Sequence, residues 1–386
     1  MTRPPHNILR DICRNLVEDY DENPGNLEKF VFSGKESLFA FIEVAQTVGS
    51  IKLYSDFLIV TLDNETCFSI KLSTSFTYFL YILGRYVRSL SVFELCPVKH
   101  CFFQGLIDNE GLTEIKFNGF VEDLAWMAIL KSVQKISAHW EFYKHLSTFG
   151  GDFSFKSLTV ISTMKYGDFS EFLELEHFKT KELTIELHPV DYDDSLFRPI
   201  ENWSSLSKIT LTINSNVDKP VGLPELVNKL PVMFPNLDYC YLENITEDET
   251  LDGNLIKESI AEIQNQFSTY SGKTKVDIKW IIVNEIHLHW DENLLETFRK
   301  EIQDRFPNYR KNEDMGIHEW TEKKSLTSNL SFELVITVNE TEYEEEEMNQ
   351  ILQDAGIYDD VDYDYYDQMD DVDVDEYDDY DYDGEF

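Results

Sequence analysis

Hydrophobic residues recur through the middle of the chain in the pattern apolar-x-x-apolar-x-apolar. This pattern is typical of a short strand reached from a loop, because alternate side chains of a strand face the same core. The clearest copy is Leu206-x-x-Ile209-x-Leu211. The middle residues of the copies are spaced by 21 to 31 residues, and they are Leu90, Ile115, Ile136, Leu158, Leu183, Ile209 and Cys240. We therefore expect a series of parallel strands that share one core.

The segments between these strands carry helical spacing. Phe76, Phe79, Leu80 and Leu83 follow the i, i+3, i+4, i+7 pattern, as do residues in 121–128 and 223–230. Units of ~20–29 residues with one strand and one helix or turn are the signature of leucine-rich repeats, and the series resembles them. The expected fold is α/β: a leucine-rich-repeat-like solenoid of parallel strands with intervening helices. The alternative is an ordinary α/β domain in which the triplets recur by chance.

The flanks of this series have other patterns. Residues 57–62 and 67–72 are strand-like around the polar segment 63–66, which predicts a hairpin. Five segments follow from these patterns. They are a small helical unit (1–54), a hairpin and helix that cap the array (55–86), the array (87–274), a C-terminal cap (275–341) and a tail (342–386).

The N-terminal unit carries short helical stripes. Ile8, Leu9, Ile12 and Leu16 lie on one side of a first helix, and a later helix carries Leu38, Phe41, Ile42 and Ala45. About fifty residues bury little core of their own. We therefore expect this unit to pack against the array or against a partner.

This arrangement resembles an F-box followed by leucine-rich repeats, as in substrate-recognition subunits of cullin–RING ubiquitin ligases. The resemblance implies that a Skp-type adaptor binds exposed apolar side chains of the first helix and that the repeats hold the protein to be ubiquitinated. The adaptor contact would then be made by Pro5, Ile8, Leu9, Ile12 and Leu16. The alternative is a capping helical unit that binds no adaptor. The resemblance rests on Pro5-x-x-Ile8-Leu9-x-x-Ile12-Cys13-x-x-Leu16, Leu27, Phe30, Ser33-Gly34-Lys35 and Ile51-Lys52-Leu53.

Charge narrows the choice of partners. The 386 residues carry 33 Lys+Arg against 73 Asp+Glu, a formal charge of −40. This excess of negative charge argues against nucleic acid and against an anionic membrane surface as binding partners. Residues 342–386 hold 21 Asp/Glu and eight Tyr but no Lys, Arg or His. Such a segment cannot bury a core, so we expect a disordered acidic tail, which either binds basic proteins or only keeps the chain in solution.

Candidate chemistry is sparse. Two groups could ligate a metal, namely Cys96-x-x-x-His100-Cys101 and the alternating Glu285, His287 and His289, although a solvated polar strand is the simpler interpretation of the second. We find no Gly-x-Ser-x-Gly elbow, no phosphate-binding glycine loop and no His-Glu-x-x-His. The sequence therefore predicts no enzyme, no catalytic residue, no metal and no cofactor.

Five scattered cysteines and a polar N-terminus without an export signal favour reduced thiols, and hence a cytoplasmic or nuclear location. No segment is apolar enough for a membrane span.

The sequence thus predicts a non-enzymatic interaction scaffold, an F-box-type receptor that binds an unknown target along its sheet. The expected target-binding residues flank the core positions of the strands: Glu114, Lys116, Thr159, Thr184, Glu186, Thr210 and Thr212. The alternative comes from the tail, since the chain also resembles the acidic leucine-rich nuclear phosphoproteins, which bind basic partners and act as histone chaperones. A third possibility is a metal-dependent enzyme at Glu285, His287 and His289.

Overall fold

The structure is a computed structural model of the whole chain. It describes residues 5–20, 23–63, 66–73, 77–94, 101–119, 126–150, 152–175, 177–187, 200, 203–215, 223–247, 252–268, 270–287, 292–306, 308–312 and 316–341. The predicted tail, 342–386, lies outside these residues. The structural statements below concern the described residues.

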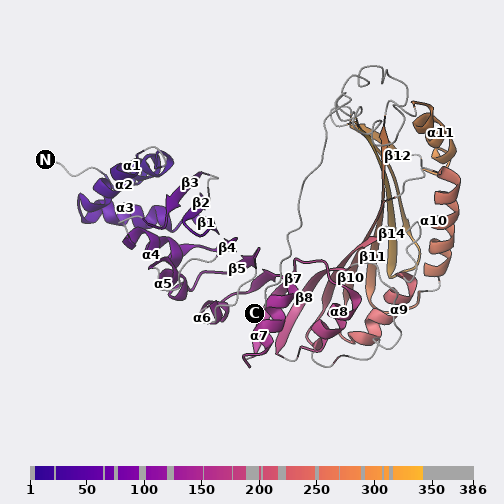
Figure 1. Ribbon diagram of the computed structural model, residues 1–386, viewed down its shortest axis with the longest axis horizontal. Helices are drawn as coiled ribbons and strands as arrows, with labels where there is room; N and C mark the ends of the chain where they lie inside the picture. Colours follow the sequence, from indigo (N-terminus) through magenta and orange to yellow (C-terminus); the bar gives the residue numbers. More distant parts are fainter. Residues whose placement is uncertain are drawn as a thin grey trace, which may run out of the picture.

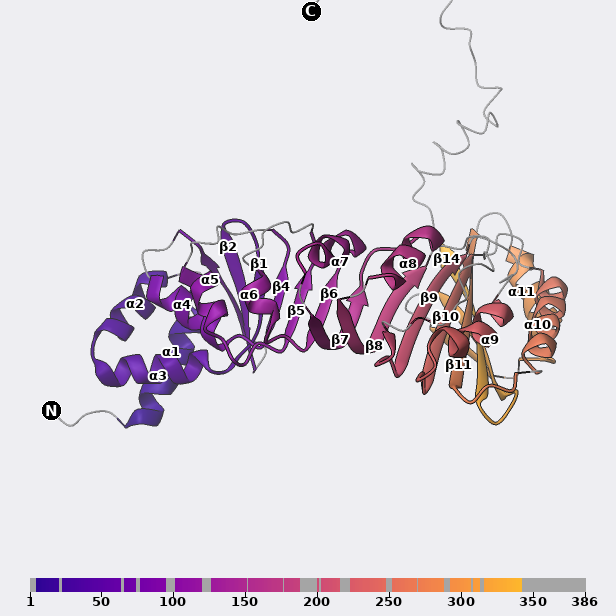
Figure 2. The same ribbon diagram turned by 90° about the horizontal axis from the view of Figure 1, so that it is seen from below.

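One sheet of fourteen strands forms the framework, in the order β12-β13-β14-β11-β10-β9-β8-β7-β6-β5-β4-β1-β2-β3 (Figures 1 and 2). The strands are β1 (Val48–Leu53), β2 (Phe57–Leu62), β3 (Cys67–Lys71), β4 (Ser89–Val92), β5 (Glu114–Phe117), β6 (Lys135–Ala138), β7 (Phe153–Val160), β8 (Phe178–Leu187), β9 (Lys208–Ser215), β10 (Tyr239–Glu247), β11 (Lys275–His287), β12 (Asn308–Asn312), β13 (Ile317–Ser325) and β14 (Leu330–Thr341).

Eleven helices are described. They are α1 (His6–Glu18), α2 (Pro24–Phe32), α3 (Lys35–Ala45), α4 (Thr77–Tyr86), α5 (Cys101–Ile107), α6 (Trp126–Leu130), α7 (Trp140–Ser147), α8 (Tyr166–Leu173), α9 (Leu223–Met233), α10 (Gly253–Phe267) and α11 (Glu292–Ile302). The sheet bends into an arc, with α4–α11 along its outer side and the strands lining the hollow (Figure 1). No helix in the described ranges combines the length and the apolar character needed to span a membrane.

The predicted register of the strands is confirmed. Leu90 lies opposite Ile115, Ile115 opposite Ile136 and Ile136 opposite Leu158. The row continues through Leu183, Ile209 and Cys240. All strands from β1 through β4–β11 to β14 pair in parallel, so equivalent residues of successive units stack side by side.

The row is longer than the predicted array. Ile51 of β1 pairs with Leu90, and Val276 of β11 joins Cys240 to Leu330 of β14. The parallel series therefore runs past residue 274 without a break in the sheet. The core positions of β11 and β14 follow those of the preceding parallel strands at intervals longer than the predicted period, so spacing assigned both strands to the C-terminal cap (275–341) rather than to the array. Antiparallel strands close both ends, the predicted hairpin β2–β3 at one and β12–β13 at the other.

Burial explains the repeat pattern. Each unit buries three side chains on the helix side of the sheet. In the unit of β4 these are Leu90 and Val92 of the strand and Val87, which lies three residues before Leu90. Thr180 is the one polar residue at a leading position of the predicted copies, and its hydroxyl donates to the carbonyl of Glu182 at 2.9 Å. A buried polar group is tolerated because it has this partner.

The N-terminal helices lean on the end of the array, as expected for a unit with a small core. α1 packs on α3 and reaches β3. The ring of Tyr20 lies 6.1 Å from that of Phe68 and 5.7 Å from that of Phe79, while Phe41 lies 4.9 Å from Phe79. These edge-on aromatic contacts join α1 and α3 to the hairpin and to α4.

Candidate functional site

The concave face is the side of the sheet that lines the hollow of the arc. Its residues alternate with the buried core residues and are half-buried or exposed, as Thr184 and Glu186 are between Leu183, Ile185 and Leu187. No described helix covers this side in Figure 1. An extended, uncovered face of this size is the natural candidate for a binding surface.

The predicted target-binding residues all lie on this face. Thr159 pairs with Thr184, and Thr184 pairs with Thr210, so these threonines form one continuous row. Glu186 lies opposite Thr212 in the same manner. Glu114 and Lys116 occupy the corresponding positions of β5, separated from the threonines by β6 and its small side chain Ser137.

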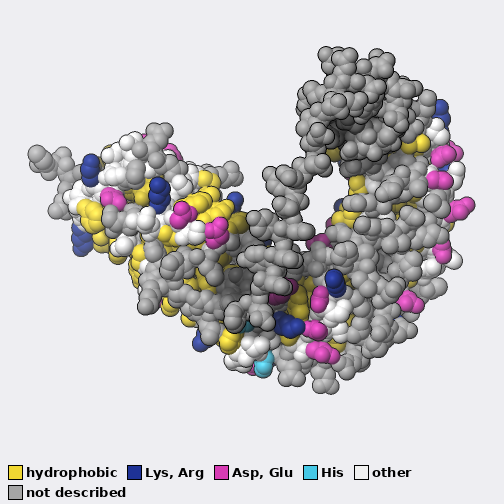
Figure 3. All heavy atoms as spheres, in the orientation of Figure 1, with side chains coloured by type: hydrophobic (Ala, Val, Ile, Leu, Met, Phe, Trp, Pro, Cys, Tyr) yellow, Lys and Arg dark blue, Asp and Glu magenta, His cyan; other side chains and the backbone are white. Residues whose placement is uncertain are grey.

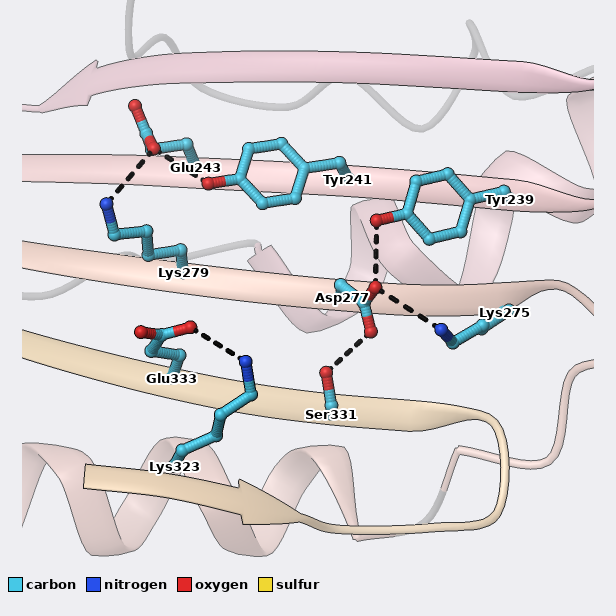
Figure 4. Close-up of polar contacts among 9 residues, drawn as sticks. All are labelled: Tyr239, Tyr241, Glu243, Lys275, Asp277, Lys279, Lys323, Ser331 and Glu333. Atoms are coloured by element: carbon cyan, nitrogen blue, oxygen red, sulfur yellow. Dashed lines mark hydrogen bonds and ion pairs between the residues drawn. The ribbon is translucent and has the colours of Figure 1, made fainter.

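The strands β10, β11, β13 and β14 carry a network of polar contacts in three separate groups on the concave face (Figure 4). The Tyr239 hydroxyl donates to Asp277 Oδ2 at 2.8 Å, and the Ser331 hydroxyl donates to Asp277 Oδ1 at 2.6 Å. Lys275 Nζ lies 3.6 Å from the same carboxylate. Asp277 is therefore surrounded by donors.

The next row of the network repeats this arrangement. The Tyr241 hydroxyl donates to Glu243 Oε2 at 2.8 Å, and Lys279 Nζ lies 3.7 Å from that oxygen. Lys323 of β13 pairs with Glu333 of β14 at 3.2 Å. The carboxylates of Asp277, Glu243 and Glu333 thus each contact a lysine of the same or a neighbouring strand, and those of Asp277 and Glu243 also accept a tyrosine hydroxyl.

These contacts shift the pKa values of the network. Burial, together with the hydrogen bond to Asp277, raises the pKa of Tyr239 to about 12. Burial and the hydrogen bond to Glu243 likewise raise the pKa of Tyr241. Burial acts to raise the pKa of Asp277, but the bonds from Ser331 and Tyr239 and the charge of Lys275 outweigh it and hold the pKa below its usual value. The tyrosines therefore stay protonated donors and Asp277 stays ionised at neutral pH.

The other end of the concave face has an aromatic row that the sequence analysis missed. Tyr54 stacks between Phe57 and Phe93, with ring centroids 4.5 Å and 4.9 Å apart and planes within 8° of parallel. Phe93 is 38% exposed and the other two rings are half-buried. Yellow side chains gather over this arm of the arc in Figure 3. Phe57 begins β2, whereas Tyr54 and Phe93 each directly follow a strand whose alternation places them on this face, a signal that could have been read once the strand register was assumed.

The predicted adaptor-binding residues divide between two faces of α1. Ile8 and Ile12 are 45% and 40% exposed, Pro5 is exposed and Leu16 is half-buried. Leu9 differs from the expectation, because it is only 8% exposed and faces the interior with Cys13 and Val17. Leu9 lies about 100° from Ile8 around the helix, toward the buried side of Cys13 and Val17, so a partner on the outer face meets the two isoleucines instead.

The candidate metal ligands lie mostly outside the described residues. Cys96, His100 and His289 lie outside the described residues, and Glu285 and His287 are described only as backbone of β11. Among the side chains that are described, no group of three His, Cys, Asp or Glu residues could hold a metal ion. Among the described residues, Cys13, Cys67, Cys101 and Cys240 form no disulfide bond.

No family model matches the sequence. A search of curated proteins likewise finds no match. Function is therefore inferred from the residues of the chain itself.

Proposed function

We propose that the chain is a non-enzymatic protein-interaction scaffold of the leucine-rich-repeat type, serving as the F-box-type substrate-recognition subunit of a ubiquitin ligase. The in-register parallel series with helices on its outer side supports the repeat assignment. In a solenoid each unit contacts only its neighbours, and the row of strands leaves a long face for a protein target. The concave face, with its threonine row and Glu186, would hold that target.

The observation that carries the adaptor half of this proposal is the exposure of Ile8 and Ile12 on α1. Large aliphatic side chains on one helix face, with no cover from the described part of the chain, fit a helix that binds a partner through apolar contacts. The opposite face of α1 is fixed on the body through Leu9, Cys13 and Val17. A partner can therefore bind the outer face without unfolding the unit.

A capture experiment with purified Skp-type adaptor tests this proposal. The double variant Ile8→Asp/Ile12→Asp should lose adaptor capture by the intact chain, because two buried charges at an apolar interface are strongly unfavourable. The control is Val232→Asp on α9, a 52% exposed aliphatic residue on the helix between β9 and β10. Equal capture by the wild type and the double variant, or no capture by the wild type, would exclude the adaptor assignment.

The acidic tail supports a second candidate, a chaperone of basic proteins such as histones. The observation is compositional: 21 acidic residues in 342–386 without one base. Replacing this segment in the full chain by a Gly/Ser segment of the same length should then abolish histone binding and leave adaptor capture intact. Binding to histones should also fall steeply with salt, whereas an apolar contact through Ile8 and Ile12 should not.

A further inference from the structure

The lysines on the concave face differ between the two ends of the arc. Lys275, Lys279 and Lys323 each lie within 4 Å of a carboxylate. Lys52, Lys71 and Lys116 are exposed, and none of them forms an ion pair with another described residue. The open-face side chains of β1–β6 include four lysines (52, 71, 116 and 135) against one acid, Glu114, in a chain whose formal charge is −40. This arm of the face is locally basic.

The aromatic row adjoins these lysines. Lys71 lies opposite Phe57 in the β2–β3 pair, and Lys52 lies opposite Ile59 in the β1–β2 pair. Ser91 separates Lys52 from Lys116 along the next row. The rim adds Asp56 and Glu94, and the Glu94 carboxylate already accepts the N–H of Ser55 at 3.2 Å. We name the surface formed by Lys52, Tyr54, Phe57, Lys71, Phe93 and Lys116 the basic–aromatic patch.

We propose that the basic–aromatic patch is the docking surface of the chain's own acidic segment, residues 342–386. This segment alternates carboxylates and tyrosines, as in Asp379-Tyr380-Asp381-Tyr382-Asp383. Its carboxylates complement the three unpaired lysines, and its tyrosine rings complement the stacked row of Tyr54, Phe57 and Phe93. The other arm of the face is a poorer competitor because Lys275, Lys279 and Lys323 are already paired with carboxylates and Lys208 lies over the ring of Tyr239.

The path of the chain brings the segment to the correct edge of the sheet. β1, β4 and β14 belong to one parallel series, so their carboxyl ends point to the same edge. Tyr54 and Phe93 directly follow β1 and β4, and the acidic segment starts directly after Thr341 at the end of β14. The acidic segment therefore begins at the same edge of the sheet at which Tyr54 and Phe93 lie.

The segment is also long enough. In the order of the sheet, nine strand-to-strand steps separate β14 from β1. At ~4.8 Å a step this is about 43 Å along the sheet, whereas 45 extended residues reach about 150 Å. Covalent attachment gives the segment an effective concentration of about 1 mM or more at the patch. A target that uses this arm of the concave face must displace it, and this inference holds whether or not an adaptor binds α1.

Zero-length carbodiimide cross-linking of the full chain, with mapping by mass spectrometry, tests the docking. An equal mixture of ¹⁴N- and ¹⁵N-labelled chains separates links within a chain from links between chains. We expect Lys52, Lys71 and Lys116 to be linked to carboxylates of 342–386 about fivefold more than the control lysines, Lys131 and Lys300, as tethering predicts. Lys300 lies on α11 with 71% of its side chain exposed. Links spread evenly over all lysines, links only between differently labelled chains, or no links to the patch would each overturn the proposal.

A second measurement uses the tyrosines of the segment as cleavage sites for chymotrypsin. The triple variant Lys52→Glu, Lys71→Glu, Lys116→Glu should release the segment and raise its cleavage rate about fivefold, since the opposing charges then repel. The matched control, Lys35→Glu, Lys131→Glu, Lys300→Glu, makes the same change in net charge elsewhere and should leave the rate unchanged. Equal rates for the two triple variants would contradict docking on the patch.

Discussion

The two arms of the arc share one strand register but differ in strand length and in the chemistry of the concave face. β4, β5 and β6 have four residues each, whereas β8 has ten, β11 thirteen and β14 twelve. On the long strands, carboxylates, tyrosines and lysines satisfy one another. On the arm with the short strands, stacked rings and unpaired lysines remain. Regular packing of the core thus leaves each arm free to present a different surface.

Equivalent core positions in the two arms give the largest expected effect. Leu90 in the short β4 and Leu183 in the long β8 are both fully buried and occupy the same row. Leu90→Ala and Leu183→Ala should each lower the free energy of unfolding by ~2–5 kcal/mol, through lost apolar burial and the cavity left behind. Chemical denaturation followed by circular dichroism measures both. A loss below about 1 kcal/mol at either site would show that the two arms do not share one kind of core.

The two arms also differ in how their helices pack, because two glycines allow α4 and α5 of the short-strand arm to approach closely. A Cβ at Gly84 on α4 would collide with the carbonyl oxygen of Phe102, and one at Gly105 on α5 would collide with that of Tyr81. Because backbone cannot move aside cheaply, Gly84→Ala should cost ~1–3 kcal/mol of stability. Gly167→Ala on α8, with nothing within 4 Å, is the control and should be neutral or slightly stabilising. A thermal denaturation series that ranks the two variants the other way would refute this account of the α4–α5 contact.

The tyrosine network gives the long-strand arm a pH-dependent contribution to stability. The pKa of Tyr239 is about 12 in the folded chain against an ordinary value of 10.0. Its contribution to stability is therefore fully present below pH 10 and is lost as the pH rises through about 12. Tyr239→Phe should flatten the fall in unfolding free energy over this window, measured by urea denaturation at several pH values.

Removing Asp277, which accepts the Tyr239 hydroxyl, tests how far this contact raises the pKa of Tyr239. Asp277→Ala takes away both the acceptor and the negative charge beside Tyr239 but leaves the burial that is the larger cause of its raised pKa, so it should flatten the profile in part. Profiles for both variants that parallel the wild type would show that the Tyr239–Asp277 contact does not set the pKa of Tyr239.

The smallest effect compares lysines of the two arms. Lys279→Gln breaks the pair with Glu243 and should cost about 0.2–1 kcal/mol at low salt. Lys116→Gln removes no ion pair with a described residue and should stay within about 0.5 kcal/mol of the wild type. Repeating the denaturation in 1 M salt should bring the two variants together, and a difference that persists there would mean that packing rather than charge separates them.

The sequence by itself determined the order and the register of β4–β10, because each of these units repeats the same buried triplet and neighbouring units must align the triplets to bury them. It also located the hairpin of β2 and β3 and the stripe of α1. Leu9 was misplaced because an apolar residue at helical spacing does not reveal which face meets the body. Only the tertiary structure brought Phe93 against Tyr54 and Phe57, since Phe93 follows β4 and stacks on Tyr54 across the pairing of β1 with β4. The same holds for Tyr239, Asp277 and Ser331, whose hydrogen bonds connect strands distant in sequence and leave no local pattern.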